Sequence, residues 1–144
     1  MRTVRDGDGT RYVLLKESGE ASLVRDPETG RERHLPNADL ERVEGEPPLV
    51  TASRAVSEPV RRILTAVPDD RALGLLFEID ARGTASVRAL LEATDLCESD
   101  LHGLLAEFRA AGVVTETRVG GKCGYKTTDL ARTGLARLRD GDRE

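Results

Sequence analysis

Aromatic residues are scarce in this chain of 144 residues, which contains two Tyr, two Phe and no Trp. Hydrophobic residues make up 38% of the sequence, so the core must consist mainly of Leu, Val and Ala. No run approaches the roughly eighteen consecutive apolar residues that a membrane-spanning helix needs. Met1 is followed directly by charged residues rather than by an apolar leader. We therefore expect a cytoplasmic protein without a membrane segment.

Potential metal ligands and reactive groups are also few. The chain has two cysteines, Cys97 and Cys123, and two histidines, His34 and His102, and none of them has the paired spacing of a zinc site. A disulfide is improbable in a cytosolic protein. The sequence contains no nucleophile with a partnering base, no paired catalytic carboxylates and no phosphate-binding glycine loop. We expect no metal, no cofactor and no enzymatic activity.

Lysine is also scarce: the chain has only Lys16, Lys122 and Lys126. Arginine supplies most of the positive charge, and the formal net charge is −4. An acidic, arginine-rich and lysine-poor composition is typical of a high-salt cytoplasm or of a GC-rich genome. Nucleic-acid-binding domains are usually basic, so any DNA-binding function must be inferred from local features rather than from the overall charge.

Residues 1–46 have the pattern of a small antiparallel β segment. Turn-forming clusters at 6–9, 17–20 and 26–30 alternate with short strand candidates. These candidates are RYVLLK at 11–16, ASLVR at 21–25 and RERHLP at 31–36. The following stretch EGEPPLVTAS, at 44–53, contains two prolines and a glycine, which indicates irregular structure. We place a linker at residues 47–56 and expect the β segment to need support from the rest of the chain or from a second copy.

Residues 57–144 show helical periodicity and then a hairpin. A helix is predicted at 57–67, with Val60, Ile63, Leu64 and Val67 on one face, and further helices are predicted over 69–83 and 86–94. A fourth, over 98–111, has Leu101, Leu105 and Phe108 at helical spacing, and we expect them to be buried against Leu76, Leu90 and the last helix. The strands VVTETRV and YKTTD flank GGKCG, whose glycines suit a flexible tip, and an amphipathic helix at 128–139 ends the pattern.

This order of helices and hairpin predicts an α+β fold, mainly α with a small β part, in which a winged helix-turn-helix domain follows the β segment. Residues 68–139 resemble bacterial and archaeal regulators of the arsenic-repressor and multiple-antibiotic-resistance-regulator type. The resemblance is carried by SVRALLEATDLCESDLHGLLAEFRAAGVV, by TRVGGKCGY and by YKTTDLARTGL. The whole chain also resembles small haloarchaeal proteins that have this unit behind a β-rich N-terminus. The resemblance implies a regulator of transcription that binds double-stranded DNA.

In this resemblance the helix at about 98–111 enters the major groove and the wing at about 113–127 contacts the phosphate backbone. Cys97 takes the N-cap position, and Ser99, Asp100, His102 and Gly103 take positions that usually face the groove. The candidate DNA-binding residues are Ser99, His102, Gly103, Arg109, Arg118, Lys122 and Lys126. Such regulators generally pair through elements outside the reading unit, so we expect a homodimer formed through the helix at 57–67, the helix at 128–139 or the β segment.

Glu98 and Asp100 in the first turn of the reading helix leave a second interpretation open. Carboxylates there interact favourably with the positive helix end, by about 0.3–1 kcal/mol each, but they also repel phosphates. High salt screens that repulsion, and a carboxylate can accept a hydrogen bond from cytosine N4. Net charge is +2 over 113–128 but −3 over 1–46, which favours the wing over the β segment as a phosphate contact. The alternative function is a winged-helix adaptor that binds proteins and not DNA.

Overall fold

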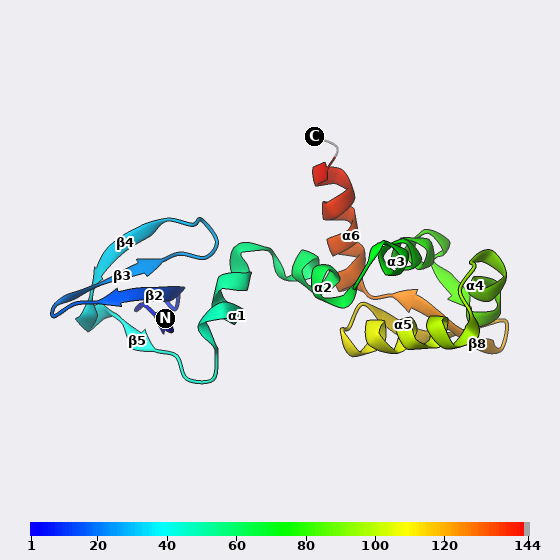
Figure 1. Cartoon of the computed structure of the whole chain (residues 1–144), viewed down its shortest axis with the longest axis horizontal. Coiled ribbons are helices and arrows are strands. Elements are labelled where there is room, and N and C mark those ends of the chain that lie inside the picture. The colour runs from blue at the N-terminus through cyan, green and yellow to red at the C-terminus, as the bar shows by residue number, and fades with distance from the viewer. Residues whose placement is uncertain (143–144) are drawn as a thin grey trace. The chain divides into compact units, whose positions relative to one another are not determined.

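The turn clusters of the N-terminal segment separate short strands in the computed structural model, which describes residues 1–142. The three predicted strands are present as β2, β3 and β4, and two further strands, β1 and β5, were not predicted (Figure 1). β1 and β5 contain four and two residues and begin or end with charged side chains, so their periodicity is too short to detect. The strands are β1 (Arg2–Arg5), β2 (Arg11–Glu17), β3 (Ala21–Arg25), β4 (Glu32–Pro36) and β5 (Glu41–Arg42).

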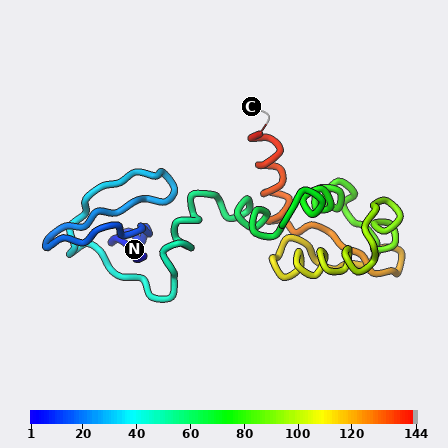
Figure 2. Tube along the Cα trace, in the orientation of Figure 1, coloured from blue at the N-terminus to red at the C-terminus, as the bar shows by residue number. Residues whose placement is uncertain are grey.

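These five strands form one antiparallel sheet in the order β4-β3-β2-β1-β5. β1 to β4 are successive hairpins, and the chain then returns through a 3-10 turn, η1 (Asn37–Asp39), so that β5 pairs with β1 (Figure 2). The side chains of Val4, Tyr12, Leu14 and Val24 form a small core of their own. The contacts of the chain divide it into two units, Met1–Ser57 and the residues from Glu58 onward.

The prediction of irregular structure at 44–53 is wrong from Pro48 onward. Pro48–Ala52 form a short helix, α1, and Ser53–Ala55 continue as a 3-10 turn, η2. The two prolines, Pro47 and Pro48, occupy the N-cap and first helical positions. A missing N–H costs nothing there, because the first turn leaves those groups unpaired in any case. Proline therefore begins this helix instead of preventing it.

A polar network fastens α1 to the first sheet. The Glu46 carboxylate accepts hydrogen bonds from Arg11 and Arg54 at 2.6 Å each, and from the Thr51 hydroxyl at 2.6 Å. The hydroxyls of Thr51 and Thr3, both buried, are 2.6 Å apart. Burial tends to raise the pKa of Glu46, but the hydrogen bonds from Thr51 and Arg54 and the positive charges of Arg54 and Arg11 hold this pKa below its usual value.

The second unit is a winged helix-turn-helix. Four helices are followed by a hairpin and a last helix, and a short strand, β6, pairs with the hairpin to give a sheet in the order β6-β8-β7. β6 was not predicted, because three residues give no periodicity. The elements are α2 (Glu58–Ala66), α3 (Asp70–Arg82), β6 (Thr84–Ser86), α4 (Val87–Ala93), α5 (Glu98–Ala110), β7 (Val114–Val119), β8 (Lys122–Thr127) and α6 (Asp129–Asp142).

Local signals set the ends of these helices. The Asp69 carboxylate accepts the Ala72 N–H at 3.0 Å and caps α3, which ends at Gly83 with a φ of +77°. The Ser86 hydroxyl accepts the Ala89 N–H at 3.0 Å and caps α4. These caps fix where α3 and α4, the two helices before α5, begin.

The core of the second unit confirms the predicted face of α5. Leu101, Leu105 and Phe108 have no exposed surface and lie in one cluster with Leu76, Leu90 and residues of α6. The predicted face of the first helix is wrong at one position, since Leu64 is 53% exposed while Ile63 and Ala66 are buried. At Gly134 of α6 the backbone of α2 approaches so closely that a Cβ would lie 2.7 Å from the Pro59 carbonyl carbon. The packing of α2 against α6 therefore buries Ile63 and Ala66 and leaves Leu64 largely exposed.

The predicted flexible tip GGKCG is also wrong in extent. Only Gly120 and Gly121 form the turn, with φ values of +59° and +80°, while Lys122, Cys123 and Gly124 belong to β8. Two consecutive positive φ angles are the requirement of a two-residue type I′ hairpin. Gly124 is buried where a Cβ would lie 2.8 Å from the Ala85 carbonyl oxygen, so this glycine permits the close pairing of β8 with β6.

Candidate nucleic-acid interface

Helix α5 is fixed on one side and exposed on the other. Cys97 takes its N-cap position, as the resemblance implied, but makes no capping hydrogen bond, and its Sγ lies 3.5 Å from the Ser99 Oγ. The helix ends before Gly112, whose φ is +76° and whose N–H donates to the Arg109 carbonyl at 3.0 Å. The buried Leu101, Leu105 and Phe108 hold it against the core. The opposite side is therefore held rigidly toward solvent.

All seven candidate DNA-binding residues are exposed. On α5 these are Ser99, His102, Gly103 and Arg109, and on the hairpin they are Arg118, Lys122 and Lys126. Two of them have acidic partners. His102 Nε2 lies 3.7 Å from the Glu98 carboxylate one turn earlier, and Arg109 donates to Glu116 of β7 at 2.8 Å.

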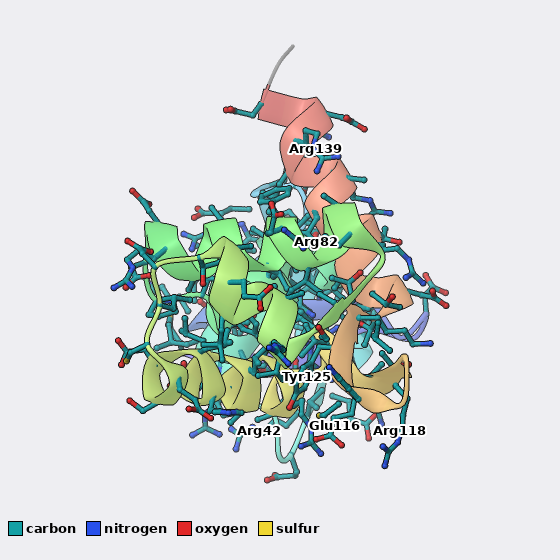
Figure 3. The ribbon with its side chains drawn as sticks, turned by 90° about the vertical axis from the view of Figure 1, so that its right-hand side faces the viewer. Arg42, Arg82, Glu116, Arg118, Tyr125 and Arg139 are labelled. Atoms are coloured by element: carbon teal, nitrogen blue, oxygen red, sulfur yellow. The ribbon has the colours of Figure 1, made fainter. Side chains whose placement is uncertain are left out.

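The pair Arg109–Glu116 connects the end of α5 to the hairpin. Tyr125 lies opposite Glu116 in the register of β7 and β8, and its side chain is buried (Figure 3). Burial raises the pKa of the Tyr125 hydroxyl, Cys123 and Glu116 add to the increase, and Arg109 opposes it. Glu116 appeared in the sequence only as one acidic residue in a basic segment. Nothing local indicated that it would pair with Arg109, because the pairing depends on how α5 packs on β7.

The hairpin separates its three candidate cations between two faces. In antiparallel pairs, residues opposite each other share a face, and the faces alternate along each strand. Arg118 pairs with Cys123 and so shares a face with Glu116 and Tyr125. Lys122 pairs with Val119 and Lys126 pairs with Thr115, on the other face. Arg118, Lys122 and Lys126 therefore do not form one patch on a single face of the hairpin.

Each of these three cations lacks a carboxylate partner in the described residues, 1–142. The Arg118 guanidinium donates a hydrogen bond to the Gly121 carbonyl at 2.9 Å, so this side chain lies against the turn. Lys122 and Lys126 have neither a salt bridge nor a side-chain hydrogen bond among the described residues. The hairpin consequently presents positive charge that no carboxylate of residues 1–142 neutralises.

Within residues 1–142 no group of three His, Cys, Asp or Glu side chains is arranged to hold a metal ion. Cys97 and Cys123 are both free and exposed. No helix among the described residues is long and apolar enough to span a membrane.

Solved structures similar to this chain include winged-helix regulators. An ArsR-like transcriptional regulator from Rhodococcus sp. RHA1 is 21% identical, with 59% of this chain and 84% of that chain covered and a TM-score of 0.44. Reduced HlyU from Vibrio cholerae is 24% identical, with 58% and 88% covered and a TM-score of 0.46. BpsR of Bordetella bronchiseptica, whose DNA binding is regulated by 6-hydroxynicotinic acid, is 15% identical, with 62% and 70% covered and a TM-score of 0.44. These likenesses concern the fold alone.

None of the curated proteins matches the chain. The profile of DUF7346, described as a family of unknown function, matches residues 1–139 and thus both units. The chain therefore belongs to the DUF7346 family.

Proposed function

We propose that this protein is a sequence-specific DNA-binding regulator of transcription, with the reading helix at about 98–111 in the major groove and the wing at about 113–127 on the phosphate backbone. The observation that carries the proposal is the hairpin beside α5, whose Arg118, Lys122 and Lys126 have no carboxylate partner among the described residues. The sequence motifs that resemble regulators of the arsenic-repressor and multiple-antibiotic-resistance-regulator type support it.

The exposed strip of α5 suits contact with base edges. Ser99 and Gly103 are small and four residues apart, so they share a face and allow the helix backbone to approach closely. His102 can donate or accept a hydrogen bond at a base edge. Arg109 has to exchange Glu116 for a phosphate or a base, because one carboxylate already occupies its guanidinium. We expect Arg109 to contribute less to affinity than a free arginine would.

The division of the wing cations between two faces supports insertion of the wing edge-on. A minor groove about 6 Å wide has a phosphate backbone on each side. A hairpin that lay flat on one backbone would use only one of its faces. With Arg118 on one face and Lys122 and Lys126 on the other, an inserted wing offers a cation to each backbone.

A salt series tests the proposal. We expect duplexes of genomic DNA to bind the wild-type chain, with log affinity falling linearly as log salt rises. Arg118→Ala with Lys122→Ala should weaken all duplexes about equally and reduce the slope by about two units. Arg2→Ala with Arg25→Ala, in the net-negative β segment, is the matched control and should leave the slope unchanged. An unchanged slope in the wing variant would remove the wing from the interface.

We also propose that the regulator is a two-fold homodimer formed through α2 and α6. A groove of about 410 Å³ lies beside this pair of helices, with Leu64 53% exposed at its edge. Arg139 covers Phe77 within this groove, its guanidinium carbon 5.1 Å from the ring centre. The groove is lined by Ile63, Leu64, Val67, Leu73, Phe77, Leu138, Arg139 and Asp142. We expect a dimer that buries this mainly apolar surface to present its two α5 helices to successive major grooves, as dimeric regulators of this fold do.

Light scattering tests the dimer. The wild-type chain should have a dimer mass at micromolar concentration in both low and high salt, and Leu64→Asp should shift it to a monomer. The fold should tolerate this change, because Leu64 is more than half exposed. Thr65→Asp on the same helix is the control, since Thr65 is exposed and lies outside the groove. A monomer mass of the wild type in both salts would contradict the dimer.

The second candidate function is a protein-interaction adaptor. It is favoured by Glu98, Asp100 and Glu107, which are all exposed on α5, together with the net charge of −4. An adaptor of this kind would bind a basic protein surface through the same helix. The adaptor is supported if the wild-type chain binds no DNA duplex even at low salt, where the attraction between basic side chains and phosphates is strongest.

A further inference from the structure

A groove of about 280 Å³ separates one flank of α5 from the beginning of α3. Three carboxylates and one guanidinium line it. The Asp69 carboxylate is engaged in capping α3. The polar lining residues are Asp69 and Arg71 beside α3 and Ser99, Asp100 and Glu107 on α5.

Arg71 is the only one of these charged residues that could attract an anion. Its side chain is exposed and has no hydrogen bond or ion pair within the described part of the chain, residues 1–142. The neighbouring arginines on α3 and α4 are different: Arg82 pairs with Glu78 at 2.8 Å and Arg88 pairs with Glu92 at 3.3 Å. A free guanidinium retains five N–H donors, a geometry that matches a phosphate.

The groove lies on the flank of α5 that faces away from the wing. Arg109 is bonded to Glu116 of β7 and so marks the wing side of the helix. Glu107, which lines the groove with Arg71, is two residues earlier. At 3.6 residues per turn these two positions are about 200° apart around the helix axis. Arg118 and Arg71 therefore lie beside opposite flanks of α5.

A helix in a major groove about 12 Å wide has a phosphate backbone on either side. On the wing side, Arg118 is available to one backbone. On the other side, Asp100 and Glu107 would face a backbone that carries one negative charge about every 1.7 Å along the helix axis. We propose that Arg71 binds a DNA phosphate on this second side and so offsets the acidic flank of the reading helix.

This inference rests on the proposed function, and one set of titrations separates the two. The full chain is titrated against a mixed-sequence DNA duplex by fluorescence anisotropy over a salt series. Arg71→Ala should lower the affinity and reduce the slope of log affinity against log salt by about 0.9. Arg71→Lys should restore most of that slope, because it keeps the charge. The control is Arg62→Ala, which removes an exposed arginine of α2 that pairs with Glu58.

Three results would overturn the inference. If Arg71→Ala keeps the wild-type slope while Arg118→Ala reduces it, Arg71 is outside the interface and the proposed function stands. If Arg62→Ala and Arg71→Ala reduce the slope equally, the effect reports overall charge and not a contact. If the wild-type chain binds no duplex at low salt, both the contact and the proposed function fail. The melting temperatures of Arg71→Ala and Arg71→Lys should equal that of the wild type, since Arg71 has no partner to lose among the described residues.

Discussion

Gly134 on α6 offers a test of the packing of α2 against α6 that the sequence could not supply. An exposed helical glycine replaced by alanine normally stabilises a protein by about 0.8–1 kcal/mol, through helix propensity alone. In this structure a Cβ at Gly134 would lie 2.7 Å from the Pro59 carbonyl carbon and 2.9 Å from the Ile63 Cγ1. The Pro59 carbon is backbone, so the two helices would have to separate.

The magnitude follows from the two opposing effects. Overpacking a well-packed core costs about 1–3 kcal/mol, and more when the obstacle is backbone. The gain in helix propensity returns about 1 kcal/mol of that. We therefore expect Gly134→Ala to destabilise the second unit by up to about 2 kcal/mol, and to weaken the proposed dimer because α2 and α6 border its groove.

Gly74→Ala is the matched control. Gly74 is also helical, on α3, but it is exposed and a Cβ there would meet nothing within 4 Å. It should stabilise the protein by about 1 kcal/mol. Urea unfolding followed by far-ultraviolet circular dichroism measures both variants. If Gly134→Ala were as stable as Gly74→Ala, α2 would not lie against α6 at this position and the packing described above would be incorrect.

Three further changes test other parts of the molecule. Phe108→Ala should lower the free energy of unfolding by about 3–5 kcal/mol and unfold the second unit in thermal melts, because the Phe108 side chain has no exposed surface. A nearly unchanged melting temperature would mean that the buried face of α5 is wrong. The Glu46 carboxyl has a lowered pKa in the folded chain, so its contribution to stability is present above the unfolded value of 4.5 and is lost as the pH falls through the folded pKa. Glu46→Gln should lower the free energy of unfolding at neutral pH by about 1–3 kcal/mol and make it fall less steeply as the pH is lowered. An unaltered dependence of stability on pH would contradict the hydrogen-bond network around Glu46. Asp100→Asn with Glu107→Gln should strengthen binding to a DNA duplex at low salt, and weaker binding would place this flank away from the phosphates.

Local patterns in the sequence determined the helices of the second unit and the buried face of α5. Helical spacing of Leu101, Leu105 and Phe108, the glycine stops and the cap residues depend on contacts within a few positions, so they can be read from a single chain. The same reasoning detected β2, β3 and β4 but missed β1, β5 and β6, which are too short to show a period. It was also wrong about α1, since prolines forbid a helix interior and not a helix start.

Tertiary structure alone decided how charges meet around α5. The pairing of Arg109 with Glu116, the position of Arg71 across a groove from Glu107, and the close approach at Gly134 join residues on different elements. The register of the wing likewise depends on which two glycines form its turn, and a shift of one residue would exchange its faces. Composition and periodicity indicate the longer helices and strands, but the free energy of packing selects which faces of those elements meet.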